Sequence, residues 1–92
     1  MELEVCLFNS LRKYGAGAMV FPAYLPDGAT VAELLRRLAV PAGEIYVAFR
    51  NGRSITPVLG KTPDLDTVLE QGDRVALSGP VPFSRGYGAP IV

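Results

Sequence analysis

The sequence predicts an α+β fold in which one helix packs against a small β-sheet. Two observations carry this prediction: segments with period-two apolar alternation at residues 2–8 and 74–78, and one stretch with helical apolar spacing at residues 30–38. The chain has 92 residues, which is enough for one domain with one modest core.

The first two strands are expected to form an antiparallel hairpin. Residues 2–8 alternate between apolar and mixed positions, and residues 19–25 are rich in strand-forming residues. Residues 9–18, between them, contain Asn, Ser, Arg, Lys and two glycines and are expected to form a loop. Pro22 has no backbone N–H, so the second strand should lie at an edge of the sheet or be bulged there.

The segment TVAELLRRL predicts an amphipathic helix. Thr30 and Glu33 have the spacing of a capping box at its start, and Pro41 is expected to end it. Glu33 and Arg37 should add an i, i+4 ion pair worth about 0.3 kcal/mol. The apolar positions follow the i, i+3, i+4, i+7 spacing of one face that a core would bury. They are Val31, Leu34, Leu35 and Leu38.

The second half of the chain predicts a hairpin, a turn-rich segment and a last strand. Asn51 and Gly52 form a dipeptide typical of tight turns. Val68 and Leu69 are expected to place a short helical turn on the core. The three strands are expected at residues 45–49, 53–56 and 74–78.

Charge and residue usage argue against several functions. Nine basic and nine acidic residues cancel, whereas a nucleic-acid-binding protein usually carries a basic excess. The chain has no histidine, the commonest general base and zinc ligand, so we expect no enzyme activity, no metal and no cofactor. No apolar run is long enough for a membrane span, and a single cysteine, Cys6, suits a cytoplasmic protein.

Three segments carry a resemblance to a known family: DGATVAELLRRL, VAFRNGR and TVLEQGDRVALSGPV. With their spacing, they resemble the small sulfur-carrier proteins of molybdopterin and thiamine synthesis, the MoaD/ThiS family. The resemblance covers residues 1–81 and implies a ubiquitin-like β-grasp domain there. The implied sheet has five strands in the order 2-1-5-3-4, with strands 1 and 5 parallel. Residues 82–92 would be a flexible Gly/Pro-rich tail.

The implied topology assigns side chains to the two faces of the sheet. Alternation would turn these residues toward the helix: Leu3, Val5, Leu7, Val47, Phe49, Val75 and Leu77. The opposite face would carry Cys6, Phe8, Tyr46, Ala48 and Ala76. An exposed apolar patch usually marks a docking surface, so we expect this face to bind a partner. Scattered surface aromatics, or a tail folded back over the face, are the alternatives.

The C-terminal segment departs from the family pattern. Carriers of the family end in Gly-Gly, whose carboxylate is adenylated and converted to a thiocarboxylate. Here Pro82 and Phe83 stand at that position, and no Gly-Gly dipeptide occurs in the chain. Three interpretations remain open: an adaptor or subunit that docks by its tail, a carrier precursor trimmed to Gly86 or Gly88, and an inert tail.

The adaptor is the interpretation that we favour. The resemblance implies as partner a larger protein: an adenylating activating enzyme, a synthase subunit or a metalloenzyme. Nucleic acid and membrane are not expected as partners. Aromatic residues and arginine dominate interface energies, so the tail should bind through its Phe, Arg and Tyr side chains. The tail residues expected at the interface are Val81, Pro82, Phe83, Arg85, Gly86, Tyr87 and Gly88.

Overall fold

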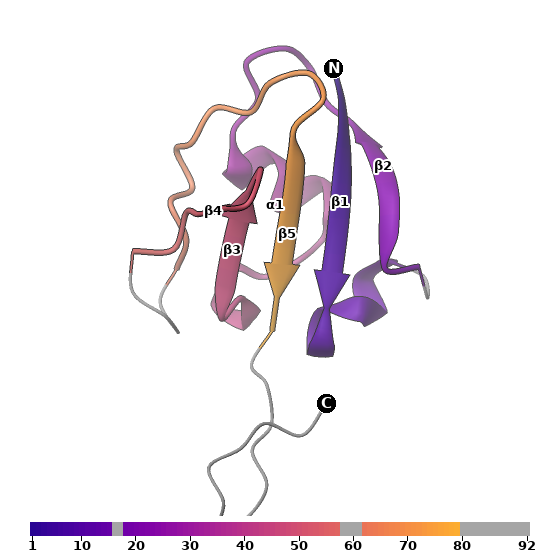
Figure 1. The fold of residues 1–92 in the computed structure, drawn as a ribbon, viewed down its shortest axis with the longest axis vertical. Helices are drawn as coiled ribbons and strands as arrows, with labels where there is room; N and C mark the ends of the chain where they lie inside the picture. The colour runs from indigo at the N-terminus through magenta and orange to yellow at the C-terminus, as the bar shows by residue number, and fades with distance from the viewer. Residues whose placement is uncertain (16–17, 58–61, 80–92) are drawn as a thin grey trace, which may run out of the picture.

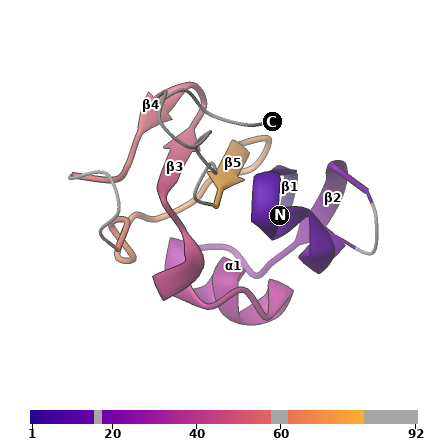
Figure 2. The same cartoon turned by 90° about the horizontal axis from the view of Figure 1, so that it is seen from below.

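The described part of the chain is a five-stranded sheet with one α-helix on one of its faces (Figures 1 and 2). This architecture is seen in a computed structural model that describes residues 1–15, 18–57 and 62–79. The strands are β1 (Glu2–Phe8), β2 (Val20–Tyr24), β3 (Val47–Arg50), β4 (Arg53–Ser54) and β5 (Arg74–Ser78). The helices are α1 (Val31–Leu38) and two 3-10 helices, η1 (Asn9–Gly15) and η2 (Ala42–Glu44).

The strand order is β2-β1-β5-β3-β4, as predicted. β1 and β5 are parallel at the centre, and the other neighbours are antiparallel. Pro22 lies on the edge strand, as predicted. On both sides of β2, odd-numbered residues make the hydrogen bonds to the β1 side: the carbonyl of Met19 accepts from Leu7, and the N–H of Leu25 donates to Met1. The nitrogen of Pro22, at an even position, therefore faces the free edge, where a missing donor costs the sheet nothing.

The predicted helix forms with the predicted cap. The Thr30 hydroxyl oxygen accepts a hydrogen bond from the backbone N–H of Glu33 at 3.4 Å. The helix ends at Ala39, whose left-handed φ of 59° turns the chain. The expected Glu33–Arg37 pair is wrong, because Glu33 pairs with Arg36, one turn away at i+3. No helix in the described ranges is long and apolar enough to span a bilayer.

Two segments differ from their predicted structure. Residues 9–15 form η1 instead of a loop, because the segment must curl to bury Leu11, which is fully inside the core. The predicted helical turn at Val68 and Leu69 is also wrong. Val68 forms an isolated β-bridge with Thr30 and stays exposed, and Leu69 alone of the two enters the core.

The core lies between the sheet and α1. Leu3, Val5 and Leu7 of β1 and Val75 and Leu77 of β5 are buried there, as predicted from alternation. Each buried aliphatic side chain contributes about 1.5–3 kcal/mol relative to exposure. The helix supplies the facing layer, and segments outside the strands and α1 close its margins. These further core residues are Val31, Leu34, Leu35, Leu11, Leu25, Val40, Ile45 and Leu69.

The predicted orientation of β3 is wrong by one residue. Ala48 is fully buried in the core, whereas Val47 and Phe49 are half-buried and outside it. Ala48 pairs with Leu77 of β5, so the two side chains share the core face. Ile45 is also buried, three residues before Ala48, so the alternation is interrupted between them. Counting by twos from Ile45 therefore gives the wrong face for the rest of the strand.

Candidate functional site

The sheet face turned away from α1, here called the open face, carries the candidate site. Strand pairing sets its side chains in rows. Cys6 lies opposite Val20 on β2 and beside Ala76 on β5, and Phe49 lies opposite Ala76 on β3. Because directly paired residues point to the same face, these four side chains form one row across four strands.

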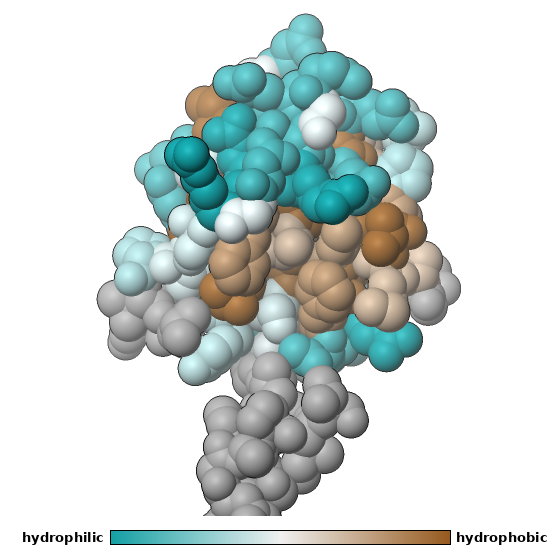
Figure 3. Space-filling model, in the orientation of Figure 1, coloured by the Kyte–Doolittle hydropathy of each residue, from teal (hydrophilic) through white to brown (hydrophobic). Residues whose placement is uncertain are grey.

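A second row lies next to the first, toward the C-terminal ends of β1 and β5. It contains Phe8, Ser78 and Val47, which pair across the sheet. Phe8 is 38% exposed and Val20 is 54% exposed, so both offer apolar surface to a partner. Figure 3 shows apolar side chains gathered across the middle of this face, below a polar region. We call the apolar members of the two rows the apolar band: Phe8, Cys6, Val20, Val47, Phe49 and Ala76.

The other half of the open face is polar. The carboxylate of Glu4 lies 2.6 Å from the guanidinium of Arg74 on the neighbouring strand. The Tyr24 hydroxyl donates to the carboxylate of Glu2 at 3.3 Å. Both ionic partners are largely exposed, so the pair contributes little to stability. These groups instead give the apolar band a charged border, which would orient a partner.

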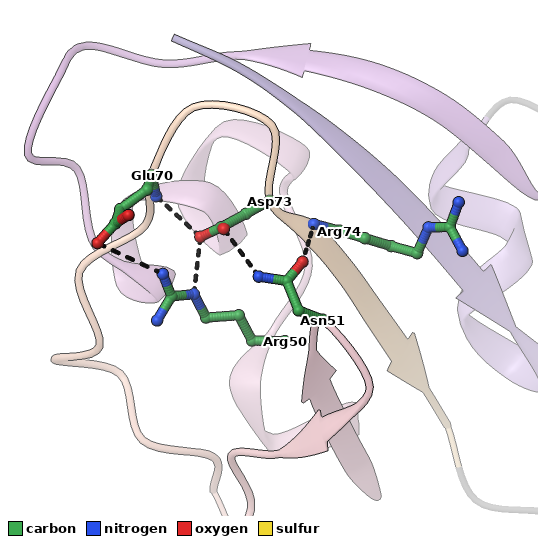
Figure 4. A network of polar contacts seen from close by, with 5 residues as sticks. All are labelled: Arg50, Asn51, Glu70, Asp73 and Arg74. Atoms are coloured by element: carbon green, nitrogen blue, oxygen red, sulfur yellow. Dashed lines mark hydrogen bonds and ion pairs between the residues drawn. The ribbon is translucent and has the colours of Figure 1, made fainter.

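A network around Asp73 fixes the β3–β4 turn against the start of β5 (Figure 4). The Asp73 carboxylate accepts hydrogen bonds from Arg50 Nε at 2.7 Å and from Asn51 Nδ2 at 2.9 Å. It also accepts from the backbone N–H of Glu70 at 2.8 Å. Asn51 in turn accepts from the N–H of Arg74 at 2.8 Å. The turn is thereby held in register with β5, which places Phe49 beside Ala76.

This network lowers the pKa of Asp73. Burial on its own would raise the pKa of this carboxyl, but the hydrogen bonds from Arg50, Asn51 and the N–H of Glu70 outweigh it. The same contacts raise the pKa of Arg50 above its ordinary value, chiefly through its hydrogen bond to Asp73. The network is therefore charged at neutral pH and works as a structural support.

Cys6 lies in the centre of the apolar band and is 8% exposed. Burial, and then the nearby carboxylate of Glu4, raise the pKa of its thiol, while Arg74 acts in the opposite direction. The thiolate is the reactive form of cysteine, so this thiol is a poor nucleophile at neutral pH. Its place on the face suits packing against a partner. Within the described residues, no group of His, Cys, Asp and Glu has an arrangement that could hold a metal ion.

The described chain leaves the sheet beside the apolar band. Gly79 follows β5, and its backbone N–H donates to the carbonyl of Phe8 at 3.3 Å. The predicted tail residues lie outside the described residues, and their role stays a prediction. They are Val81, Pro82, Phe83, Arg85, Gly86, Tyr87 and Gly88.

Of the residues predicted for the face, Cys6, Phe8 and Ala76 lie on the open side of the sheet. Ala48 does not, because it is buried opposite Leu77 in the core. Tyr46 is half-buried just before β3.

The prediction missed three members of the band: Val20, Val47 and Phe49. Alternation in residues 20–25 contained a signal for Val20, since Phe21, Ala23 and Leu25 face the core. For Val47 and Phe49 the sequence carries no such signal, because every residue of the segment 45–49 is aliphatic or aromatic.

Comparison with solved structures found close matches. The chain is similar to the solution structure of the Haloferax volcanii HVO 2177 protein, with 30% identity and a TM-score of 0.68 over 88% of this chain and 84% of that one. It is also similar to a candidate molybdopterin converting factor, subunit 1, from Pyrococcus furiosus, with 26% identity and a TM-score of 0.63 over 88% and 99% of the two chains.

A third match is small archaeal modifier protein 1 from Haloferax volcanii. The identity is 21%, and the TM-score is 0.64 over 89% of this chain and 98% of that one, a likeness that concerns the fold. A scan against protein-family models and a search of curated proteins found no match.

Proposed function

The chain belongs to the MoaD/ThiS-like family of ubiquitin-like β-grasp proteins, and from this premise we propose that it acts by docking on a larger protein. In this proposal it is a non-catalytic adaptor or subunit. The open face is its binding surface, and the segment after Gly79 is a second point of contact.

One observation carries the proposal: the apolar band lies next to the exit of the C-terminal segment. Phe8 belongs to the band, and its carbonyl accepts a hydrogen bond from the N–H of Gly79. A partner that covers the band therefore meets the beginning of that segment as well. Two contacts on one molecule strengthen each other, because the second forms at high effective concentration once the first is made.

The names of the similar structures support a choice of partner. One is a candidate subunit of a molybdopterin converting factor and another is a small modifier protein. We place this chain in a molybdopterin, tungstopterin or thiamine sulfur-transfer pathway. Its partner would be an adenylating activating enzyme, a synthase subunit or a metalloenzyme to which the domain docks.

A second candidate function is favoured by the sequence of the C-terminal segment. Gly86 and Gly88 are separated by a single residue, so cleavage after either one exposes a terminal glycine. Glycine lets a chain end enter a narrow channel without a side-chain clash. In this case the protein is a precursor of a sulfur carrier, and the mature form ends in a glycine thiocarboxylate.

Affinity purification of the chain from its native host tests docking directly. Val20→Asp places a charge in the apolar band and should abolish co-purification of the partner seen with the wild-type chain. Val68→Asp is the matched control, because Val68 is 52% exposed but lies beside the N-terminus of α1. An undiminished complex with Val20→Asp, or an equal loss in both variants, rejects the open face as the docking surface.

The intact mass of the purified chain separates adaptor from carrier precursor. A full-length species in the complex supports the adaptor. A species that ends at Gly86 or Gly88, heavier by one oxygen-to-sulfur exchange, supports the carrier and overturns the adaptor proposal.

A further inference from the structure

The polar half of the open face carries opposite charges on the two sides of its midline. A shallow hollow over β1 and β2 is lined by Glu2, Glu4 and Pro22, and by no basic residue of the described ranges. A second hollow, over β5 and β3, is lined by Arg74 and Asn51, and by no acidic residue of the same ranges. Because β1 and β5 are the central neighbours of the sheet, the line between them separates the two hollows.

One ion pair bridges this midline. The carboxylate of Glu4 and the guanidinium of Arg74 lie 2.6 Å apart, and the two side chains keep 43% and 65% of their surface exposed. Each charge is therefore open to a further contact from above the sheet. A molecule that covers the face takes water away from the pair and must present a cation over Glu4 and an anion over Arg74 to compensate.

A second copy of this chain meets that requirement. A two-fold axis that lies in the interface, parallel to the strands and above the line between β1 and β5, sets β1 of one copy over β5 of the other. Because Glu4 and Arg74 are paired at one height on these two strands, Glu4 of each copy then faces Arg74 of the second copy. Such an interface is isologous, so the contact occurs twice and the four charges alternate in sign.

The same axis places apolar side chains on apolar side chains. The apolar band fills one half of the open face and the polar groups fill the other (Figure 3). A two-fold axis parallel to the strands keeps every residue at its height along them, whereas an axis across the strands would set the band on the charges. From the row that the strand pairing defines, Val20 faces Phe49 of the second copy, and Cys6 faces Ala76. The small side chains at Cys6 and Ala76 let the two sheets approach.

The size of the face sets the strength of such a dimer. Four strands about 4.8 Å apart and about five residues long, at about 3.4 Å per residue, give a face of about 19 by 17 Å. An interface of this extent lies at the small end of the range for protein pairs, where complexes are weak and transient. The dimer therefore forms at high concentration and opens readily.

We propose that the open face binds a second copy of this chain in a face-to-face two-fold dimer, held by the apolar band and by reciprocal contacts between Glu4 and Arg74. The dimer buries the surface that docks on a larger protein, so the dimer and that complex exclude each other. This competition rests on the proposed function. The dimer itself does not, and it is measured on the full-length chain alone.

Sedimentation equilibrium under reducing conditions, which exclude a disulfide through Cys6, measures the dimer. The mean mass of the wild-type chain should rise from that of the monomer toward that of the dimer between about 20 µM and about 1 mM, as expected for a weak interface. Glu4→Arg and Arg74→Glu should each weaken association about tenfold or more, because like charges then face each other across the axis. A wild-type chain that stays monomeric over this range overturns the proposal.

Two variants with equal changes of charge serve as controls. Arg37→Glu changes an exposed residue of α1, and Asp66→Arg changes an exposed residue between two residues whose carbonyls accept hydrogen bonds from the first turn of α1. Both positions lie on the helix side of the sheet, so both variants should associate as the wild type does. A loss in the controls equal to that in Glu4→Arg and Arg74→Glu would show an effect of net charge alone and would overturn the contact.

Mixing the two reversed chains tests the reciprocal contact itself. Equal amounts of Glu4→Arg and Arg74→Glu should form a heterodimer, because each reversed charge then meets its opposite on the other chain. The double variant Glu4→Arg/Arg74→Glu should likewise recover its homodimer. Repulsion within one chain is not relieved by mixing, so recovery is specific to a contact between chains. A mixture that stays monomeric, while amide spectra show both chains folded, rejects the contact.

Amide shifts that depend on the concentration of the ¹⁵N-labelled chain locate the interface. They should be largest at Cys6, Val20, Phe49 and Ala76 and small on α1. A footprint on α1 with the apolar band unchanged would overturn the face-to-face arrangement.

These measurements keep the dimer apart from the docking function. If Val20→Asp retains the larger partner in the purification, docking on the open face fails, and sedimentation still decides whether the dimer forms. If the wild-type chain stays monomeric while Val20→Asp loses the larger partner, docking stands and the dimer is rejected.

Discussion

The carboxylate of Asp73 lies 2.7 Å from Nε of Arg50 and joins the start of β5 to the end of β3. Asp73 is buried, whereas the Arg50 side chain keeps 27% of its surface exposed. The pair is therefore half-shielded from water and is reinforced by hydrogen bonds from Asn51 and Glu70. This connection holds β3 next to β5, two neighbouring strands of the open face. Its removal should therefore lower the stability of the protein.

Asp73→Asn should lower the free energy of unfolding by about 2 kcal/mol, because it removes a charge-assisted hydrogen bond and leaves Arg50 without its buried partner. Urea unfolding at pH 7 measures the change. Asp64→Asn is the control, since Asp64 is exposed in a turn, and it should shift the value by less than about 0.5 kcal/mol. Equal stability of Asp73→Asn and the wild type would contradict the role of the network.

The lowered pKa of Asp73 makes this contribution pH-dependent. A carboxyl whose folded pKa lies below its unfolded value binds fewer protons in the native state, so stability rises with pH between the two values. The contribution is complete above the unfolded pKa of about 3.9 and is lost as pH falls through the folded pKa. The difference in unfolding free energy between wild type and Asp73→Asn should therefore shrink from pH 7 to pH 3. A difference that grows on acidification would show the opposite sign of the pKa shift.

The orientation of β3 predicts that an alanine-to-leucine substitution affects stability differently at Ala48 of β3 and at Ala76 of β5. Ala48→Leu forces a larger side chain into the closed core and should destabilise the protein by about 1–3 kcal/mol. Ala76→Leu places the same side chain on the open face, where there is room, and should cost less than about 0.5 kcal/mol. Thermal unfolding of the two variants decides between the faces. An equally small loss for both variants would instead support the orientation inferred from strict alternation, which put Ala48 and Ala76 on the same open face.

The domain boundary predicts that the fold does not depend on the C-terminal segment. A chain that stops after Val81 should unfold within about 0.5 kcal/mol of the full-length protein, because the core and its ladders lie within the described ranges up to Gly79. Its affinity for the partner should fall by roughly tenfold, through loss of the second contact. An unchanged affinity for the partner would show that the C-terminal segment does not contribute to the interface.

Sequence patterns predicted the helix and the edge position of β2, because each depends on local chemistry, whereas the sheet order was implied by the family resemblance. Thr30 caps the helix as expected, and Pro22 marks the edge strand through its missing donor. Period-two spacing predicts which faces of β1 and β5 are packed in the core. Helical spacing predicts the packed face of α1. Four features of this chain, by contrast, depend on contacts between distant segments, and a fifth is a local choice between two neighbouring side chains.

The orientation of β3 is the clearest of these. Every residue of the segment 45–49 is aliphatic or aromatic, so the pairing of Ala48 with Leu77 decides which side enters the core, and no local pattern carries that information. The burial of Leu11 within a polar-looking segment likewise depends on space left by the sheet. The exchange of Arg37 for Arg36 as ion-pair partner of Glu33 is a choice between two adjacent exposed side chains.

The other two features belong to the site. Alternation turns Val20 away from the core, but Val20 joins the apolar band because β2 pairs with β1 in the register that sets it opposite Cys6. The hydrogen bond from the Asn9 side-chain amide to Ser78 Oγ joins two residues that are far apart in the sequence and meet through the parallel pairing of β1 and β5. Neither arrangement has a sequence motif of its own, because single polar or apolar residues at strand ends are common.

Titration of the ¹⁵N-labelled chain with the co-purified partner tests the central claim most directly. The account predicts that the largest amide shifts fall on the apolar band, at Phe8, Cys6, Val20 and Ala76, and that amides of α1 change little. A footprint centred on the outer surface of α1 or around Val68, with the band unperturbed, would contradict docking through the open face.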